Sequence, residues 1–251
     1  MKKFLILFTI LLFALSGIGQ YSVGARLGAN FATITGKYSE HDDSNSGWIT
    51  GLTFGAVGNY EFTDVISLNP ELLFVTMGSK TKYSETGEKS SQSEYDVTIT
   101  ERCHFLMLPV LVRYSFGTNY PFFGYIGPYF GYDLGGHYKD ECDGYVTEGR
   151  LRWNEDKCTD NDWYMDPEDY RRFDMGLYVG GGAGKEIGPG RLEADLRFGI
   201  GFLDRNKFES KEYKQDAKDN GYKSFRNMNI SLTFAYMYEF SKKKATRYLD
   251  E

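Results

Sequence analysis

Apart from its amino terminus, the chain of 251 residues lacks any long hydrophobic run. That first run extends from Phe4 to Ile18, and no later run is longer than the one from Phe105 to Val112, which Pro109 interrupts. A helix that crosses a membrane needs about 20 consecutive apolar residues. The sequence therefore predicts no transmembrane helix.

The amino-terminal run instead has the pattern of a signal peptide. Lys2 and Lys3 precede it, and the small residues Gly17 and Gly19 fit a cleavage site just before Gln20. We therefore expect residues 1–19 to be removed on export. The remaining length is that of one domain.

The average hydrophobicity of the whole chain is also low. The mean hydropathy of −0.46 and the charged fraction of 25% are those of a soluble protein. A membrane β-barrel can share these values, because its wall exposes only alternate residues to lipid. From Asn227 to Phe240, apolar residues alternate with polar or small ones, which indicates a strand long enough for a tilted crossing of a bilayer.

The same alternation predicts seven further strands. They are Tyr21–Thr35, Trp48–Phe62, Val65–Gly78, Thr98–Phe116, Phe122–Leu134, Phe173–Lys185 and Gly190–Leu203. The links at Thr63–Asp64, Gly117–Pro121 and Glu186–Gly190 are short. The loops at about 36–47, 79–97, 135–171 and 204–225 are long. Short turns on one face and long loops on the other are typical of an outer-membrane barrel with both termini in the periplasm.

We therefore predict an all-β fold, an eight-stranded antiparallel up-and-down transmembrane β-barrel over residues 20–240, with a periplasmic tail at 241–251. A soluble barrel of the lipocalin type would bury its apolar side chains inside, where there is too little room for so many Phe, Tyr and Leu residues. The aromatic fraction of 17% suits girdles at both membrane interfaces. The predicted location is the bacterial outer membrane.

Charged residues on the opposite parity are expected to point into the lumen. They are Arg26, Glu61, Glu71, Arg113, Asp174, Glu193, Asp195, Arg197 and Glu239. An eight-stranded barrel is only wide enough for side chains to fill, so these charges should pair as a network that plugs it. The alternative is a path for ions or protons, which would give a measurable conductance.

Several motifs together resemble one family. These are Leu68–Phe74 with Gly78–Lys80, Leu106–Tyr114, Tyr125–Tyr132, Phe173–Leu177 and Gly180–Gly184. They are similar to those of the PorT-type, porin-like outer-membrane β-barrels of Bacteroidetes, over about Tyr21 to Phe240. The resemblance implies a barrel without an assigned substrate. The founding member of that family functions in type IX secretion, so the resemblance also leaves open a role in protein secretion.

Cysteine is scarce, at three residues. Cys142 and Cys158 lie in the longest loop, on the oxidising side of the membrane, so we predict a disulfide between them. Closing that loop would stabilise it by about 3 kcal/mol in the chain-entropy model. Cys103 is the odd cysteine and could compete as a partner.

The longest loop, Gly135 to Arg171, is strongly acidic, with eleven acidic and five basic residues. Its carboxylate oxygens are ligands that suit Ca²⁺. However, Asp160–Asp166 lacks the glycine and the terminal glutamate of an EF-hand loop. We therefore predict a solvated acidic face and no metal site. The interleaved aromatics are Tyr138, Tyr145, Trp153, Trp163, Tyr164 and Tyr170. They either form a binding surface or pack the loop on itself. Nucleic acid would need a basic surface instead.

Histidine is equally scarce, and no catalytic pattern surrounds it. His41, His104 and His137 are predicted near the extracellular rim, where an enzyme acting on lipid A would have its site, but none has a recognisable set of partners. Gly180–Lys185 ends in Gly-Lys, yet it lacks the remaining residues of a phosphate-binding loop. Small residues there are expected to make room for bulky lumen side chains.

The sequence thus predicts a non-enzymatic outer-membrane protein without a cofactor, with a structural or surface-binding role through its acidic loop. The expected partners are outer-membrane lipid and lipopolysaccharide, the barrel-assembly machinery and an unidentified surface ligand. A narrow pore, a secretion component and a lipid A-modifying enzyme are the alternatives.

Overall fold

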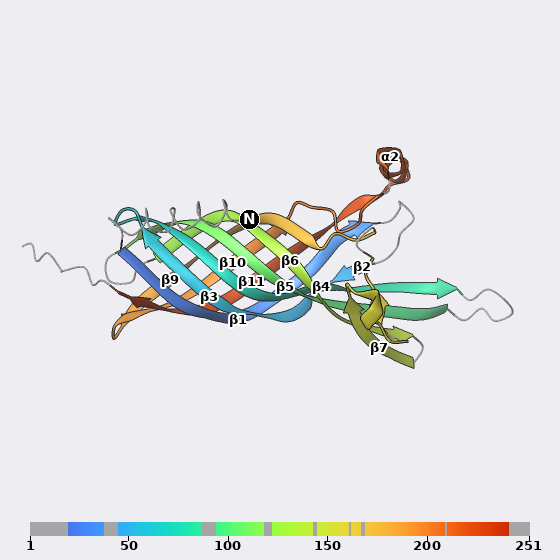
Figure 1. The fold of residues 1–251 in the computed structure, drawn as a ribbon, viewed down its shortest axis with the longest axis horizontal. Coiled ribbons are helices and arrows are strands. Elements are labelled where there is room, and N and C mark those ends of the chain that lie inside the picture. The colour runs from blue at the N-terminus through green and yellow to red at the C-terminus, as the bar shows by residue number, and fades with distance from the viewer. Residues whose placement is uncertain are drawn as a thin grey trace, which may run out of the picture.

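The computed structural model describes residues 20–37, 45–86, 94–117, 122–142, 145–160, 162–166, 169–208 and 210–240. Eight long strands form a closed ring (Figure 1). They are β1 (Gln20–Lys37), β3 (Ile49–Glu61), β4 (Ile66–Thr86), β5 (Glu94–Phe116), β6 (Phe122–Cys142), β9 (Phe173–Ile187), β10 (Gly190–Gly201) and β11 (Lys223–Glu239). The predicted signal peptide and the predicted tail lie outside the described residues.

Every neighbouring pair in the ring is antiparallel, and the pairing of β1 with β11 closes it. The register runs without interruption from Ser22 opposite Glu239 to Thr35 opposite Arg226. This confirms the predicted eight-stranded antiparallel up-and-down barrel. None of the helices in the described ranges is long and apolar enough to cross a membrane.

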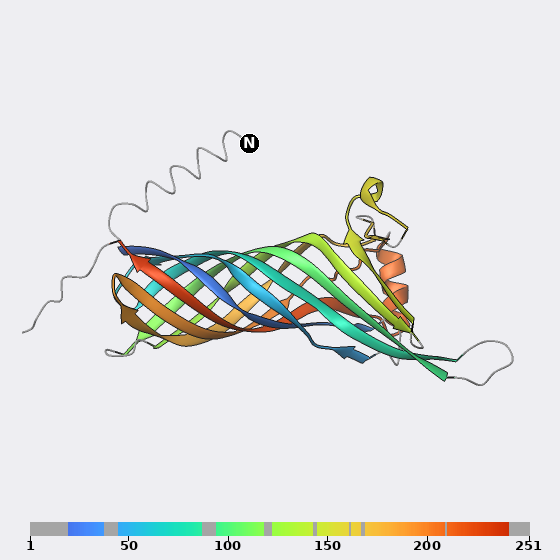
Figure 2. The same cartoon turned by 90° about the horizontal axis from the view of Figure 1, so that it is seen from below.

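The two ends of the barrel differ (Figure 2). The turn end carries the start of β1, the end of β11 and the turn between β9 and β10, where Gly188 adopts a φ of +62°. The loop end carries the short elements β2 (Asn45–Gly47), β7 (Tyr145–Arg152), β8 (Trp163–Tyr164), η2 (Glu155–Lys157) and α2 (Lys211–Asp219). Among the described residues, the short turn and the long extensions therefore lie at opposite ends of the barrel.

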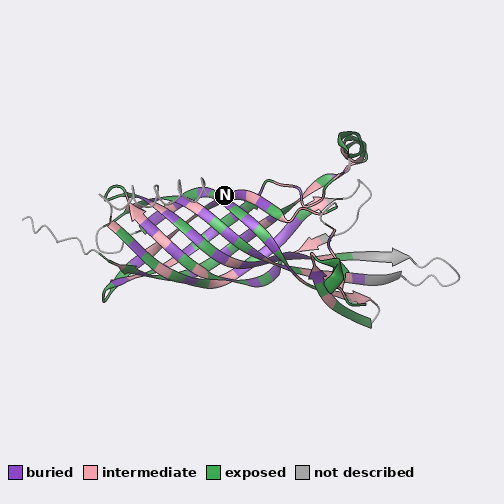
Figure 3. Ribbon diagram, in the orientation of Figure 1, coloured by how far each residue is buried: buried purple, intermediate pink, exposed green. Residues whose placement is uncertain are grey.

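Exposure alternates along each strand (Figure 3). On β10, Leu196 is 58% exposed, whereas its neighbours Asp195 and Arg197 are 2% exposed. The outer wall is a band of exposed Leu, Ile, Val, Phe and Tyr side chains, and the lumen holds most of the buried charged and polar ones. A soluble barrel would show the opposite arrangement. The wall suits a hydrocarbon environment.

Aromatic side chains cluster near both rims of this wall. At the turn end, Tyr21 stacks on Phe240 at 5.2 Å and Phe116 on Phe122 at 6.0 Å between ring centroids. Nearer the loop end, Phe130 stacks on Phe173 at 6.5 Å. Aromatic side chains at both rims are typical of a wall that spans a bilayer.

The strands at the loop end are longer than predicted. β4 and β5 remain paired from Gly78–Arg102 out to Thr86–Glu94, so most of the predicted loop at 79–97 is a two-stranded ribbon. β6 continues to Cys142 and pairs there with β7, and the predicted loop at 204–225 contains α2. The prediction failed because the alternation imposed by lipid ends at the membrane, whereas the hydrogen-bonded ladder continues beyond it.

The glycine run of β9 makes room for lumen aromatics, as the sequence suggested. Gly180 lies opposite Tyr125 of β6, and a Cβ atom there would come within 2.8 Å of the Tyr125 ring. It would also come within 2.6 Å of the Leu196 carbonyl oxygen. A larger residue at this position has no space.

Replacing Gly180 by alanine should therefore destabilise the barrel by about 1–3 kcal/mol, the usual cost of overpacking. The measurement is urea-induced unfolding of the protein folded into lipid vesicles. Gly124→Ala is the matched control, because its nearest neighbour would be 3.8 Å away. Equal stability of the two variants would show that the close contact at Gly180 costs nothing.

Candidate functional site

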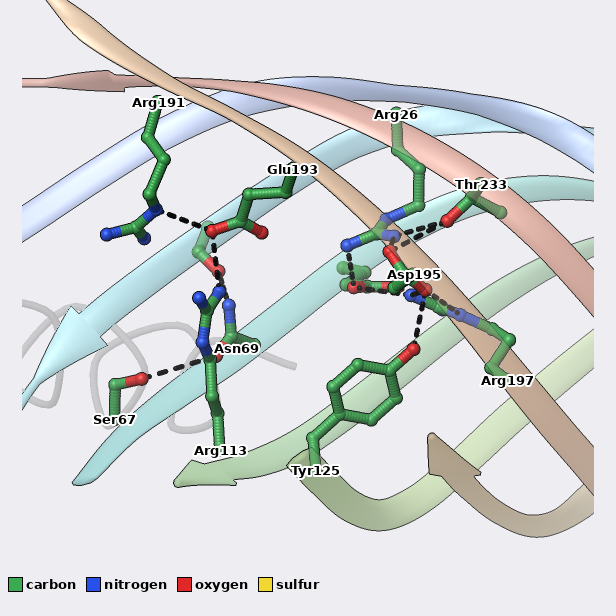
Figure 4. A network of polar contacts seen from close by, with 12 residues as sticks. Arg26, Ser67, Asn69, Arg113, Tyr125, Arg191, Glu193, Asp195, Arg197 and Thr233 are labelled. Atoms are coloured by element: carbon green, nitrogen blue, oxygen red, sulfur yellow. Dashed lines mark hydrogen bonds and ion pairs between the residues drawn. The ribbon is translucent and has the colours of Figure 1, made fainter. Parts of the chain in front are cut away.

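The middle of the lumen holds a four-membered charge cluster formed by Arg26, Glu71, Asp195 and Arg197 (Figure 4). Arg26 lies 3.2 Å from Glu71 and also pairs with Asp195. Arg197 lies 2.7 Å from Glu71 and 3.3 Å from Asp195. Each cation thus touches both anions, and the four charges cancel.

Neutral residues complete the bonding of Asp195. The Tyr125 hydroxyl donates to Asp195 at 2.6 Å and the Thr233 hydroxyl at 2.9 Å. The guanidinium of Arg197 lies 5.3 Å from the centroid of the Tyr125 ring and 5.6 Å from that of Tyr178. A buried ion cluster is tolerated when its remaining lone pairs and protons are satisfied in this way.

A second cluster lies nearer the turn end. Glu193 accepts from Arg113 at 2.8 Å and from Arg191 at 2.7 Å. Arg191 also lies 3.5 Å from Glu239. The Arg113 guanidinium covers the ring of Phe123 at 3.7 Å. This cluster too has two cations and two anions.

The outer half of the lumen is mainly apolar. Tyr129 and Tyr178 pack at 4.8 Å between ring centroids, and Met77, Phe105 and Met107 are buried around them. Asp174 lies here, separate from the charge clusters, and accepts from the side chains of Asn227 at 2.9 Å and Tyr129 at 3.1 Å. Salt bridges and apolar packing therefore fill successive levels of the lumen.

The structure thus places the nine predicted lumen residues in three settings. Seven are buried, whereas Glu61 and Glu239 are partly exposed at the turn end. Of the seven, Asp174 pairs with no cation in the described part of the chain. Arg191 and Tyr125 were missed, although Arg191 shares the parity of Glu193 and so could have been found from the sequence.

At the loop end, β4 to β7 form a sheet that extends beyond the ring. β6 pairs with β9 only as far as Tyr132 opposite Phe173, and from Gly136 onward it pairs with β7 instead. The chain then returns through η2, and β8 runs parallel to β7 at Leu151 and Trp163. We call this part, β4 to β7 beyond the ring together with β8, the outer sheet.

Asp162 joins the returning chain to the edge of β7. Its carboxylate accepts from the Arg152 side chain at 2.7 Å, from the Thr159 N–H at 3.0 Å and from the Arg150 N–H at 3.1 Å. Desolvation raises the pKa of Asp162, but these hydrogen bonds outweigh it and lower the pKa from 3.8 to about 2. The carboxylate is therefore held in its charged form.

Acid should release this attachment. Because the pKa is lower in the folded state, the stabilisation is complete above pH 4 and is lost as the pH falls through about 2. Trp163 is adjacent, so its fluorescence in a variant with Trp48 and Trp153 changed to Phe should report a transition between pH 4 and 2. Asp162→Asn should abolish that transition, and its persistence in the variant would contradict the assignment.

The aromatic side chains of the longest predicted loop divide between two roles. Tyr138, Trp153 and Tyr170 pack against the buried core. Tyr145 and Trp163 are 79% and 54% exposed. Self-packing and an accessible surface therefore both occur, in different members of the predicted set.

The predicted disulfide is not present in the structure, where all three cysteines are free thiols. Cys142 pairs with Tyr145 at the tip of the β6–β7 hairpin. Cys158 follows η2, next to Thr159, whose N–H reaches Asp162 beside Arg150. Arg150 is five residues from Tyr145 along β7, or roughly 17 Å at the rise of a strand, whereas disulfide Cα atoms lie within about 7 Å.

Of the remaining candidate groups, those in the described part of the chain are His104, His137 and Cys103. His104 and His137 contact each other at 5.9 Å between ring centroids, with the Thr76 hydroxyl 3.3 Å from His104, and His41 lies outside the described residues. No group of three or more His, Cys, Asp or Glu side chains that could hold a metal ion occurs within the described ranges. Cys103 is buried and accepts from Arg205 at 3.4 Å.

Comparison with known proteins gives one family match. The sequence model of the family described as "Outer membrane protein beta-barrel domain" matches residues 18–205. A search of curated proteins gives no match.

Among solved structures, the chain is similar to three bacterial surface or outer-membrane proteins. For Neisserial surface protein A the identity is 13%, with 85% of this chain and 95% of the other covered and a TM-score of 0.36. For Ail, the attachment invasion locus protein of Yersinia pestis, the identity is 13% and the TM-score 0.34. The match covers 88% of this chain and 99% of Ail. For OprG from Pseudomonas aeruginosa, the identity is 9% and the TM-score 0.37. The match covers 88% of this chain and 96% of OprG.

Proposed function

Since the chain belongs to the outer membrane protein beta-barrel domain family, and so resides in the bacterial outer membrane, we propose that it is a non-enzymatic surface-binding protein. The barrel serves as a closed anchor, and the outer sheet presents the binding surface to the medium. The loop end faces outward in this arrangement, as the long connections of such barrels do.

The filled lumen is the observation that carries this proposal. Arg197, Glu193, Asp195 and Tyr129 are each at most 2% exposed, and they come from different levels of the barrel. A conducting pore would need a continuous water-filled path past these side chains. Because the lumen charges already neutralise one another, they would also attract a permeating ion only weakly.

Conductance tests the closed barrel. The full mature chain, inserted in a planar bilayer at neutral pH, should give no stable open-channel current. A stable current at neutral pH would favour the narrow pore instead and would overturn the proposed anchor.

The outer sheet suits a binding role because it does not contribute to ring closure. β6 and β9 pair along Phe122–Tyr132 and Phe173–Ala183, so residues 137–169 can be removed without breaking that ladder. Tyr145 and Val146 at the hairpin tip are 79% and 55% exposed. Large apolar side chains exposed beyond the membrane indicate a contact surface.

A photo-crosslinking amino acid at Tyr145, introduced into the full chain on intact cells, tests this surface. A discrete adduct is expected at Tyr145 and not at Tyr213, which is 68% exposed on α2 and serves as the matched control. Equal adduct patterns at both sites, or none at either, would contradict a binding surface at the hairpin. An adduct with another outer-membrane component would favour the role in a secretion apparatus.

A further inference from the structure

One pocket of about 930 Å³ lies against the outer sheet at the loop end. Its lining includes Lys80 of β4, Arg102 of β5, His137 of β6 and Arg150 of β7. In the strand registers, Arg102 pairs with His137 and His137 pairs with Arg150. Directly paired residues share one face of a sheet, so these side chains form a continuous row.

The face that carries this row is the one that contacts lipid lower in the barrel. Along β5, Arg102 has the parity of Leu106 and Leu108, which are 43% and 45% exposed on the outer wall, whereas Cys103 and Phe105 point inward and are buried. Arg102 lies four residues beyond Leu106, or roughly 13 Å along a tilted strand. Leu106 pairs with Tyr132, next to the aromatic zone at the loop-end rim, so Arg102 lies on the headgroup side of the hydrocarbon.

Positive charge is in excess in the pocket. Its lining has five cationic and three acidic side chains. Lys139 is paired with Glu141 at 2.6 Å, and Arg152 is paired with Asp162 at 2.7 Å. The other three cations, which are Lys80, Arg102 and Arg150, have no salt bridge among the described residues.

The guanidinium of Arg102 is also held in place, because its Nη1 donates to the Thr50 carbonyl oxygen at 2.7 Å. The bond fixes the side chain but leaves its charge uncompensated. The surrounding loop is acidic overall, and so is the whole chain, at −6. The pocket therefore has a local excess of positive charge, to which Lys80 and Arg102 contribute from outside this loop.

We propose that this pocket binds the phosphate groups of an outer-leaflet glycolipid headgroup. Guanidinium groups bind phosphate oxygens with charge-assisted, often bidentate, hydrogen bonds. The volume lies within the usual range for small-molecule sites, so a phosphorylated sugar fits. Bound lipid would hold the base of the outer sheet against the membrane surface. This inference does not depend on the proposed surface-binding role, because a conducting barrel could carry the same site.

Lipid binding to the full mature chain in neutral-detergent micelles provides the test, with native mass spectrometry as the readout. Wild-type protein should retain lipid A, and Arg102→Gln with Arg150→Gln should weaken that binding at least tenfold. The control is Lys211→Gln with Lys223→Gln, which removes the same charge from exposed positions at the loop end outside the pocket lining. It should bind lipid A as wild type does.

Three results would overturn the proposal. Equal binding of lipid A and its dephosphorylated form would assign the affinity to acyl contacts. Inorganic phosphate that displaces lipid A at a matching concentration would assign the site to a free anion. An equal loss in the control would indicate a general charge effect. Because Arg102 also bonds to Thr50, Lys80→Gln gives a second variant, with a several-fold loss expected, if the double variant fails to fold.

Discussion

Replacing Asp195 by alanine is expected to lower the free energy of unfolding by about 3–5 kcal/mol, the cost of breaking a buried ion cluster by removing one partner. Arg26 and Arg197 would then share Glu71 as the only anion of the middle cluster. The Tyr125 hydroxyl would also lose its acceptor. Urea-induced unfolding in lipid vesicles measures the change.

Two further variants make this result specific. Asp216→Ala removes an exposed acid from α2 and should alter stability by less than about 0.5 kcal/mol. Arg26→Met combined with Asp195→Leu leaves Arg197 paired with Glu71, so it should recover most of the loss. If Asp195→Ala is as stable as Asp216→Ala, the lumen cluster does not contribute to the stability of the barrel.

Replacing Leu196 by arginine should cost about 2–4 kcal/mol, the value for a cation on the lipid face near the middle of the bilayer. Leu196 is 58% exposed and pairs with Leu232 of β11 in the central part of the wall. Its exposure means that the new side chain would have room, so the penalty would come from the surrounding hydrocarbon and not from crowding.

The control for this variant is Tyr145→Arg, at a site that is even more exposed but lies beyond the membrane. It should change the stability by less than about 0.5 kcal/mol. Both variants are measured by unfolding in vesicles. Equal and small effects at the two positions would mean that Leu196 faces water, which would contradict the assignment of the outer wall to lipid.

The strands and their faces could be predicted because lipid on one side and a packed lumen on the other impose a strict two-residue period. Leu192, Leu196 and Phe198 alternate with Glu193, Asp195 and Arg197, and the structure puts the two sets on opposite faces. The strand ends could not be predicted in the same way. Thr81 to Thr86 continue β4 by backbone pairing with β5, and no alternation imposed by lipid marks this part of the strand.

The polar partners were harder to predict than the faces. The pairing of Arg197 with Glu71 joins β10 to β4, which are not neighbours in the ring, so no local pattern indicates it. The excess of positive charge at the pocket was hidden for a similar reason. Arg150 and Arg102 come together only because β6 lies between β7 and β5. The net charge of the loop, which is negative, gives no indication of this.

The switch of β6 from one partner to another also bears on how the barrel is assembled. About 40 residues separate Tyr132 from Phe173, and bringing distant segments together costs chain entropy that grows slowly with their separation, at about 0.6 kcal/mol per doubling. The β6–β7 hairpin is a local contact that can form early and shorten the span still to be closed by about a third. Early formation of the outer sheet would then lower the entropy cost of pairing β9 with β6 during insertion.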